Sequence, residues 1–412
     1  MLPLLLLASS LTGNSPELPT ELPVEPRRNC APIALIGGFT TWGREELLGF
    51  HYWGGSKGDI QEDLRRHGFD AVTTAVGPLS SNWDRACEAY AILKGGRVDY
   101  GKAHALQHGH ARFGRSHPGL LKDWGERDPA TGGPRRVHLL GHSQGGQTAR
   151  VLVQLLEKGD PSERDATPPE DLNPLFQGGH PWVFSVTTIS TPHDGTSLVF
   201  QHEGLVGPVR KLLALGATSA SPHHNTIYDV KLDQWGIHRQ AGESIRAFSR
   251  RLLASPLWTG TRDFAAWDLG PDGARELNGW AKAQPGVFYF SWSTAKTRED
   301  AHGHHVPMPG MTALWRSGAR YMGQALRASN GLVPVDASWW RNDGVVNTRS
   351  MAGPSTETVQ SCSGTPRKGL WNHMGVLDGW DHSEIIGIGP KHGPEVLDFY
   401  RRWAAFLGSL ED

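Results

Sequence analysis

The sequence predicts an α/β fold with a mostly parallel central sheet and helices on both of its faces. Short apolar runs of strand length alternate along the chain with segments of helical periodicity. The stretches between them are rich in turn-forming residues such as glycine and proline. Alternation of this kind implies parallel strands whose crossover helices bury the sheet on both sides.

The predicted strands and helices follow one another along the chain. Strands are expected at four apolar runs, over residues 32–36, 71–76, 136–140 and 183–189. One helix is expected over residues 59–66 and is ended by Gly68. Another is expected from Gln147 to the turn at residues 159–161. Long surface loops are expected at four polar stretches, over residues 157–181, 215–226, 299–310 and 352–369.

The composition indicates a globular protein with no charge-driven partner. The chain has 412 residues, of which 38% are hydrophobic, and a formal net charge of -1 at pH 7. This balance gives no basic field that would attract nucleic acid or anionic membranes. Beyond the first residues, no stretch approaches the roughly 18 consecutive apolar residues of a membrane span, so stable membrane insertion is not expected.

Residues 1–30 indicate a leader and a linker rather than part of the folded domain. The run MLPLLLLASSL is typical of the apolar core of a secretory signal, so we expect a secreted, extracellular protein. The prolines that follow predict an extended linker, and the fold is expected to begin near Ala31. Three cysteines allow at most one disulfide, for which Cys30 and Cys362 are the candidate pair.

A serine in the sequence GHSQG, at residues 141–145, is the candidate nucleophile. The pattern G-x-S-x-G places a serine on a sharp turn, where small neighbours let the backbones pass close together. A predicted strand precedes it and a predicted helix follows it, which is the context that the motif requires. Without catalytic partners, Ser143 would be an ordinary solvated serine in a glycine-rich turn.

A serine nucleophile needs a histidine to take its proton and a carboxylate to orient that histidine. In this topology the acid and then the histidine follow the serine along the chain. The candidates in the last third of the sequence are the acids Asp336, Asp343 and Asp378 and the histidines His373, His382 and His392. Local context favours Asp343 and His382, which lie in polar turns beside apolar runs, but it leaves the others open. Backbone N–H groups of Gln144 and Phe39 are the expected oxyanion donors.

Nine motifs, in the same order, resemble those of the thermostable alkaline bacterial lipases and the related staphylococcal lipases. They are GFTTWGREE, FHYWGGSKGDI, AVGPLSSNWDRACEAY, VDYGKAHALQHGHARFGR, GHSQGGQTAR, TTISTPHDGT, YDVKLDQWG, NDGVVNT and WDHSEIIG. The resemblance implies a single α/β-hydrolase domain over residues 31–412. It also implies inserted zinc-subdomain segments at about 80–115 and 225–270 and a lid at about 200–225. A short amphipathic helix could form within that lid, over residues 207–215.

The same resemblance implies roles for particular residues. Asp343 and His382 become the acid and base of the triad, and Phe39 and Gln144 the oxyanion donors. One departure is Gly37, because the family usually has histidine at this position of the oxyanion loop. A backbone donor survives that change, but whatever the histidine side chain orients is lost.

Two metal sites also follow from the resemblance. A structural zinc ion would be bound by Asp84, His104, His110 and Asp263, which form a closed set of nitrogen and oxygen ligands. Without the resemblance, His104, His108 and His110 would be read as surface histidines. A calcium ion would match the Gly310 carbonyl, Glu384, Gly389 and the Pro390 carbonyl. The family has aspartate in place of Gly389, so this site is expected to be weak or absent.

The expected function is that of a secreted triacylglycerol lipase or carboxylesterase that acts on lipid esters at an oil–water interface through an acyl-enzyme. A soluble esterase or thioesterase for short acyl chains stays open as an alternative. So does a lipid-binding relative without catalysis. Two further histidine groups, at residues 302–305 and at His223 and His224, match no family site and are expected to be solvated loops.

Overall fold

A computed structural model describes residues 27–201, 205, 207, 209, 210, 228–362 and 364–411. The predicted leader at residues 1–26, most of the predicted lid and its helix, and His223 and His224 lie outside the described residues. Among the helices that the structure describes, none is long and apolar enough to cross a membrane.

The centre of the fold is a parallel seven-stranded sheet with the strand order β10-β11-β7-β6-β5-β1-β2. Its strands are β1 (Ile33–Ile36), β2 (Ala71–Thr74), β5 (Val137–His142), β6 (Val183–Ile189), β7 (Phe288–Ala295), β10 (Val359–Ser361) and β11 (Trp371–Asp378). The four predicted strands are all present in it. The predicted parallel α/β architecture is therefore confirmed.

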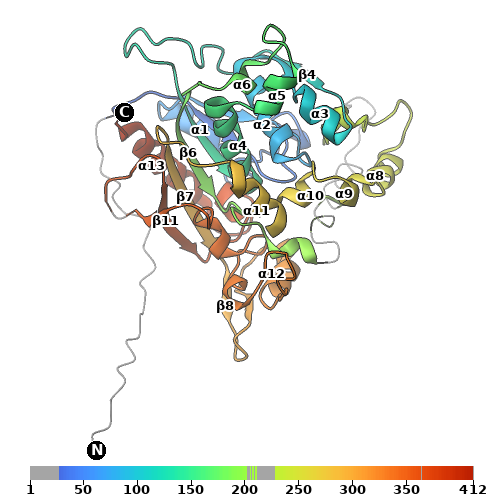
Figure 1. Cartoon of the computed structure of the whole chain (residues 1–412). Helices are drawn as coiled ribbons and strands as arrows, with labels where there is room; N and C mark the ends of the chain where they lie inside the picture. Colours follow the sequence, from blue (N-terminus) through green and yellow to red (C-terminus); the bar gives the residue numbers. More distant parts are fainter. Residues whose placement is uncertain are drawn as a thin grey trace, which may run out of the picture.

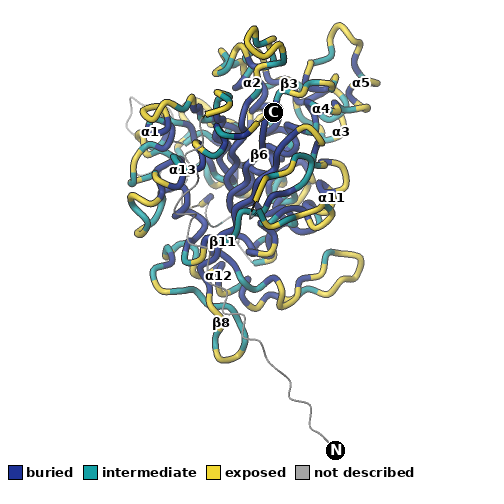
Figure 2. The backbone as a smooth tube through the Cα atoms, turned by 90° about the vertical axis from the view of Figure 1, so that its left-hand side faces the viewer, coloured by how far each residue is buried: buried dark blue, intermediate teal, exposed yellow. Residues whose placement is uncertain are grey.

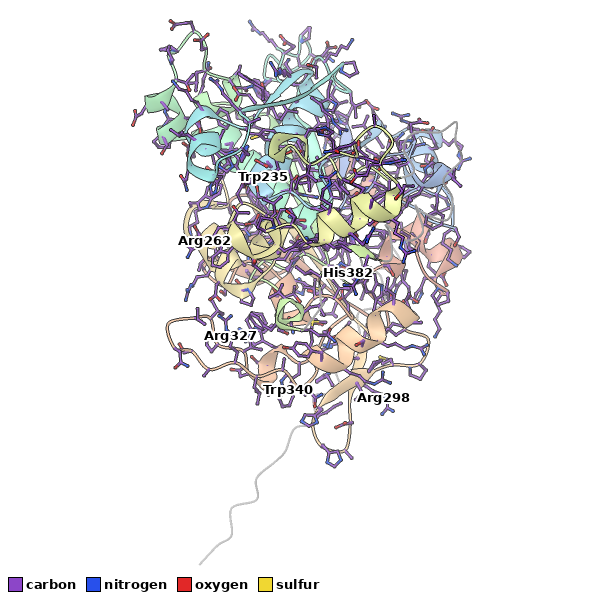
Figure 3. All side chains as sticks on the ribbon, turned by 90° about the vertical axis from the view of Figure 1, so that its right-hand side faces the viewer. Trp235, Arg262, Arg298, Arg327, Trp340 and His382 are labelled. Atoms are coloured by element: carbon purple, nitrogen blue, oxygen red, sulfur yellow. The ribbon has the colours of Figure 1, made fainter. Side chains whose placement is uncertain are left out.

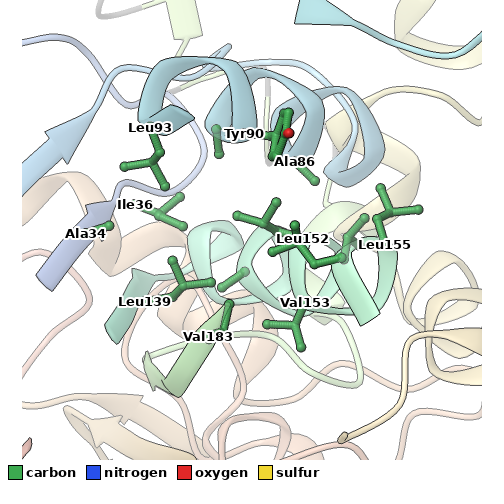
Figure 4. Close-up of a cluster of buried hydrophobic side chains, with 14 of the residues drawn as sticks. Ala34, Ile36, Ala86, Tyr90, Leu93, Leu139, Leu152, Val153, Leu155 and Val183 are labelled. Carbon is green, nitrogen blue, oxygen red and sulfur yellow. The ribbon is translucent and has the colours of Figure 1, made fainter. Parts of the chain in front are cut away.

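Helices cover both faces of the sheet (Figure 1). Side chains alternate along β1, so Ala34 and Ile36 join one buried apolar cluster while Ile33 and Leu35 join another. The first cluster is covered by α2 (Asn82–Lys94) and α4 (Gln144–Lys158), whose side chains meet those of the strands in Figure 4. The second is covered by α1 (Ile60–Arg66) and α13 (Gly393–Ser409). Strands β1, β5, β6 and β7 are accordingly buried along their whole length, at the centre of the molecule (Figure 2).

The other elements surround this core. The other α-helices whose bounds lie in the described part of the chain are α3 (Lys102–His108), α5 (Pro161–Ala166), α6 (Pro174–Gln177), α8 (Ile245–Leu253), α9 (Leu257–Gly260), α10 (Ala265–Asp268), α11 (Pro271–Trp280) and α12 (Arg316–Met322). Two antiparallel pairs are formed by β3 (Gly96–Asp99) with β4 (Phe113–His117), and by β8 (Thr297–Glu299) with β9 (His305–Pro307).

Three of the predicted surface loops contain regular structure. The stretch 157–181 contains α5 and α6, 299–310 contains β9, and 352–369 contains β10. The side chains of Asp160 and Asn173 cap α5 and α6, and a proline opens each helix. Aspartate, asparagine and proline are frequent in loops, but they are also residues that begin helices, which is why composition alone gave the wrong assignment. The predicted helix from Gln147 begins earlier, at Gln144.

The predicted disulfide is wrong. All three cysteines lie within the described residues, and each is a free thiol. Cys30 precedes β1 and Cys362 follows β10, and these strands are five positions apart in the sheet. Five strand spacings amount to roughly 24 Å, whereas bridged cysteines have Cα atoms less than about 7 Å apart.

Candidate active site

Ser143 lies on a strained turn between β5 and α4. Its backbone has φ 56° and ψ -129°, a conformation that L-residues rarely adopt. The neighbouring glycines are required by space: a Cβ at Gly141 would lie 2.4 Å from the Gly145 carbonyl carbon, and one at Gly145 would lie 2.1 Å from the Ile36 oxygen. The turn therefore holds the serine at the carboxyl end of the sheet, as the motif predicts.

Three side chains form a continuous chain of hydrogen bonds at this turn. His382 Nε2 lies 2.9 Å from Ser143 Oγ, and His382 Nδ1 lies 2.8 Å from Asp343 Oδ2. Because an ionised carboxylate only accepts hydrogen bonds, Nδ1 carries the ring proton and Nε2 is free to accept the serine proton. All three residues are buried. Such a chain of hydrogen bonds can activate a serine hydroxyl as a nucleophile.

The Asp343 carboxylate is held in one orientation. Its Oδ2 accepts the Thr294 hydroxyl at 2.7 Å, in addition to the histidine. Its Oδ1 accepts the backbone N–H groups of Val345 and Val346 at 3.0 and 2.8 Å. Thr294 lies near the carboxyl end of β7, so the central sheet itself fixes the acid.

The other acids and histidines that the sequence left open lie elsewhere. Asp336 accepts the N–H and hydroxyl of Ser338, and Asp378 pairs with Arg341 at 3.0 Å on the surface. His373 contacts the Ser291 hydroxyl, and the His392 ring stacks on Trp380 at 3.7 Å. The tertiary structure thus brings Asp343 and His382, rather than these residues, to Ser143.

The loop at residues 37–40 lies directly against the nucleophile. A Cβ at Gly38 would be 2.5 Å from the Ser143 Cβ, so only glycine fits there. The buried Arg85 guanidinium donates to the carbonyls of both Gly37 and Gly38. These contacts hold the residues just before Phe39 against the serine turn. Gln144 begins α4, so its N–H has no acceptor within the helix.

The departure at Gly37 has a steric explanation. A Cβ at Gly37 would lie 2.0 Å from the Thr41 hydroxyl oxygen and 3.0 Å from the Tyr52 ring. Thr41 and Tyr52 therefore occupy the space that a larger side chain at this position would need. In this chain Tyr52 and Arg85 make hydrogen bonds to the same loop.

A buried hydrogen-bond chain connects this loop to the histidine loop. The Gly38 N–H donates to the Tyr52 hydroxyl at 2.8 Å, and that hydroxyl lies 2.7 Å from His142 Nδ1. His142 Nε2 lies 2.9 Å from the His382 carbonyl, which can only accept, so Nε2 carries the proton. The Tyr52 hydroxyl must then donate to His142 Nδ1. Burial keeps the pKa of His142 well below its usual value, in agreement with a neutral ring.

Four of these contact residues, Tyr52, Arg85, His142 and Thr294, have no role in the sequence prediction. Tyr52, Arg85 and His142 lie within motifs that carry the resemblance, FHYWGG, NWDRAC and GHSQGG, and this is the only signal that the sequence offers for them. Neither residue type nor spacing indicates that they touch one another.

A second cluster joins Asp84 of α2 and His104 of α3 to His110 and Asp263. Donor atoms of these four side chains all lie within 4.8 Å of one another. His104 Nε2 is 3.4 Å from Asp84 Oδ1 and 3.3 Å from Asp263 Oδ1, and His110 Nε2 is 3.1 Å from Asp263 Oδ2. Ligands that surround a tetrahedral ion at bond lengths of about 2.0–2.1 Å lie roughly 3.3 Å apart. The predicted ligand set is therefore brought together with a spacing that suits such an ion.

The surroundings of this cluster also fit a cation. Four of its buried polar atoms, one from each side chain, have no hydrogen-bond partner among the described residues. His110 Nδ1 donates to the Ala111 carbonyl at 2.9 Å, which directs Nε2 into the cluster. Burial opposes a charge on His104, but Asp263 and Asp84 raise its pKa to about 10. These carboxylates thus favour a positive charge at this position.

The cluster is separate from the triad. Trp83 stacks on His104 with a centroid separation of 4.8 Å, and Trp235 packs on His110 at the same separation. In Figure 3, Trp235 lies well away from His382. A metal ion bound here would hold segments of the chain together without reaching the serine.

The residues of the predicted calcium site do not fit a calcium ion. Both oxygens of Glu384 accept hydrogen bonds from Lys296 Nζ, at 2.6 and 2.5 Å. Gly389 has φ 157°, and a Cβ there would lie 2.7 Å from Glu384 Cγ, so an aspartate would not fit in this conformation. The Lys391 side chain lies against Gly310, with Nζ 2.8 Å from where a Cβ would be. Calcium needs about six to eight oxygen ligands, and here cationic side chains occupy the surroundings.

The histidines at residues 302–305 form no cluster with other possible ligands in the described part of the chain. The Asp300 carboxylate accepts the backbone N–H groups of His302 and His304, and His305 lies in β9. The His304 ring packs edge-on against Trp340 at 5.2 Å. These residues build the β8–β9 hairpin.

Comparison with known families gives a match over most of the chain. A family model described as "Lipase-like, C-terminal domain" matches residues 29–407. The chain is 35% identical to the lipase of Staphylococcus hyicus over 395 residues, which make up 93% of this chain and 58% of that protein. The chain therefore spans little more than half the length of the staphylococcal relatives that it matches.

Two solved structures superpose on most of the chain, and one of them is named as a lipase. EstA from Clostridium botulinum superposes with a TM-score of 0.86 and 42% identity, covering 96% of this chain and 91% of that one. Lipase 1 from Pelosinus fermentans superposes with a TM-score of 0.84 and 44% identity, covering 93% of this chain and 100% of that one.

Proposed function

The chain belongs to the family of lipase-like C-terminal domains, and from this membership we propose that it is a carboxylic ester hydrolase that acts on acylglycerols. The observation that carries the proposal is the hydrogen-bonded line Ser143–His382–Asp343, with distances of 2.9 and 2.8 Å. The α/β-hydrolase arrangement supports it, because the serine lies on a strand-to-helix turn at the carboxyl end of a parallel sheet. A lipid-binding relative without catalysis would have no need of this geometry.

In the proposed mechanism, Ser143 Oγ attacks the ester carbonyl while its proton passes to His382 Nε2. Asp343 keeps the imidazole oriented and stabilises its positive charge. The N–H groups of Phe39 and Gln144 donate to the oxyanion of the tetrahedral intermediate. When the intermediate collapses, the proton on Nε2 goes to the departing alcohol and an acyl-serine remains. Water then attacks the acyl group while His382 Nε2 takes a proton from the water. When this second intermediate collapses, that proton returns to Ser143 Oγ, and the carboxylic acid departs.

We also propose that Asp84, His104, His110 and Asp263 bind a structural zinc ion. Two imidazoles and two carboxylates would supply a closed set of four ligands, which would leave no position for a reactive water. When bound, zinc would supply the positive charge that two buried carboxylates require. The protein ligands themselves would tie α2 and α3 to the segment that carries Asp263. We further propose that the protein is secreted, which depends on the leader sequence. Its action at an oil–water interface is proposed from the family membership.

The first test is covalent. A serine-directed phosphonate is expected to label Ser143 stoichiometrically, and Ser143→Ala is expected to abolish both labelling and ester hydrolysis. Peptide mapping after digestion identifies the labelled residue. Labelling at another serine, or activity that survives Ser143→Ala, would falsify the proposed triad.

A second test separates a lipase from an esterase or thioesterase for short acyl chains. Emulsified triacylglycerols and p-nitrophenyl esters of increasing chain length are compared with acyl thioesters. For a lipase, the rate on long-chain substrates should increase as they pass their solubility limit. A preference for dissolved short-chain substrates, with no increase of the rate at the solubility limit, would instead indicate a short-chain esterase or thioesterase.

A further inference from the structure

A buried ion pair lies next to the loop that carries His382. Lys296 Nζ donates to both oxygens of Glu384, at 2.6 and 2.5 Å, and lies 4.0 Å from Asp381 Oδ2. The Lys296 side chain is 2% exposed and both carboxylates are fully buried. A lysine is almost never buried to this degree unless it is paired, so the contact is a specific feature of the fold.

Lys296 follows β7 directly and lies two residues after Thr294. Side chains two residues apart in an extended chain point to the same side. Thr294 donates to the Asp343 carboxylate, and Lys296 donates to Glu384. The end of this one strand therefore contacts both the acid of the proposed triad and the loop of its base.

The loop that carries the proposed base His382, residues 381–384, is held by hydrogen bonds between its own residues. The Glu384 N–H donates to Asp381 Oδ1 at 3.1 Å, and the Asp381 N–H donates to Glu384 Oε2 at 3.0 Å. The Trp315 indole donates to the Ser383 hydroxyl at 2.8 Å. These contacts fix the shape of the loop, but the indole and backbone groups bring no full positive charge to its two carboxylates. Lys296 brings that charge in direct contact with Glu384, whereas the His392 ring lies farther away, with Nε2 4.0 Å from Glu384 Oε2.

We propose that Lys296 is a positioning residue for His382, and that its ammonium group does in this chain what a bound divalent cation would otherwise do for the loop. The positive charge comes from the sheet, because Lys296 is continuous with β7. The position of His382 is then independent of calcium. This inference rests on the proposed function, in which His382 is the base.

The wild-type protein provides the first test. The protein is freed of calcium in resin-treated buffer, kept with equimolar zinc, and titrated with calcium to about 10 mM, which exceeds the dissociation constants of extracellular calcium modules. A dissolved short-chain ester serves as substrate, because calcium alters lipid emulsions directly. The expected result is no binding heat, no shift of Tm and no change of kcat. Saturable calcium binding that raises kcat would overturn the inference.

The second test removes the charge. Lys296→Met keeps the length of the side chain but leaves a buried carboxylate without its partner. We expect kcat to fall about 100-fold, the size of effect that a displacement of about 1 Å can cause, with KM changed less than about twofold. The double variant Lys296→Met/Glu384→Gln restores charge balance and should recover most of the lost kcat. Such recovery is not expected if Lys296 only fills space.

Arg401→Met is the matched control. Arg401 pairs with the buried Asp63 at 2.7 Å, and joins α13 to α1 away from the triad. This variant should lower Tm without lowering kcat. If Lys296→Met keeps kcat, or lowers it no more than Arg401→Met does, the positioning role is excluded.

Failure of the inference can be told apart from failure of the proposed function. Ser143→Ala that remains active would remove the proposed function, whereas the calcium titration and the Tm values would still report on the ion pair. If Lys296→Met does not fold, the wild-type titration and the charge-balanced double variant decide the question.

Discussion

The Tyr52 hydroxyl connects the loop that carries the proposed oxyanion donor Phe39 to the loop that carries His382. It accepts the Gly38 N–H at 2.8 Å and donates to His142 Nδ1 at 2.7 Å. Tyr52→Phe removes this hydroxyl and keeps the buried ring. The variant therefore tests whether the hydrogen-bond chain sets the positions of both loops.

The expected magnitude follows from the groups left without partners. One buried N–H donor and one buried imidazole acceptor each cost about 1–3 kcal/mol, so the free energy of unfolding should fall by roughly 2–6 kcal/mol. Loss of a complete oxyanion donor lowers kcat by about 100- to 1000-fold. Since Tyr52→Phe displaces the loop but keeps the Phe39 N–H, we expect kcat to fall about 10- to 100-fold.

The assay compares kcat and KM on a dissolved p-nitrophenyl ester with unfolding in urea. Tyr289→Phe is the matched control, because the buried Tyr289 hydroxyl also accepts a backbone N–H, from Gln284 at 3.0 Å, but lies near the opposite end of the sheet. This control should lose stability and keep kcat. If Tyr52→Phe loses stability but keeps wild-type kcat, the hydrogen-bond chain does not position the oxyanion loop.

Three further predictions follow from the same contacts. Asp343→Asn should lower kcat by about 10⁴-fold without unfolding the protein, because an amide at this position favours the wrong histidine tautomer. Steady-state kinetics measure the loss, with circular dichroism as a folding control, and a much smaller loss of kcat would contradict the role of Asp343. Purified protein should contain one equivalent of zinc, and either a strong chelator or Asp84→Asn should lower Tm by several degrees. The chelated wild-type protein should recover its Tm when zinc is added, but not when calcium is added. Metal analysis and calorimetry measure these effects, and a Tm that does not change on chelation would contradict the prediction. Burial lowers the pKa of His138 to about 3, so below its unfolded pKa of about 6.5 the unfolded chain binds a proton that the folded chain does not. Stability is therefore lost as pH falls from about 6.5 towards 3, and His138→Gln should show a smaller decrease of Tm over that window; equal slopes for both proteins would exclude this cause.

Local features of the site could be read from the sequence. The serine turn is specified by glycines within a few residues, and the structure shows backbone atoms where their side chains would be. The four predicted strands are found because a buried parallel strand requires a continuous apolar run. The resemblance added the four predicted zinc ligands, whose side chains come together as a possible metal-binding group.

Contacts between distant segments could not be derived in this way. Local context left three acids and three histidines open, since His382 lies 239 residues from Ser143 and nothing in the intervening sequence measures their separation in space. The disulfide prediction failed for the same reason, because strand order separates Cys30 from Cys362. The loop prediction at residues 157–181 failed because capping residues and turn residues are the same amino acids.

By itself, the sequence determined the α/β class, the position of Ser143 on its turn and the set of side chains from which a triad could be built. These depend on periodicity and on steric requirements between neighbouring residues. The resemblance implied Asp343 and His382, but only the tertiary structure showed that they contact Ser143. It alone showed that Tyr52 and His142 connect the two loops, and that Lys296 occupies the cationic position beside Glu384. Those pairings depend on which strands lie side by side, and strand order is fixed by the packing of the whole sheet rather than by any local pattern.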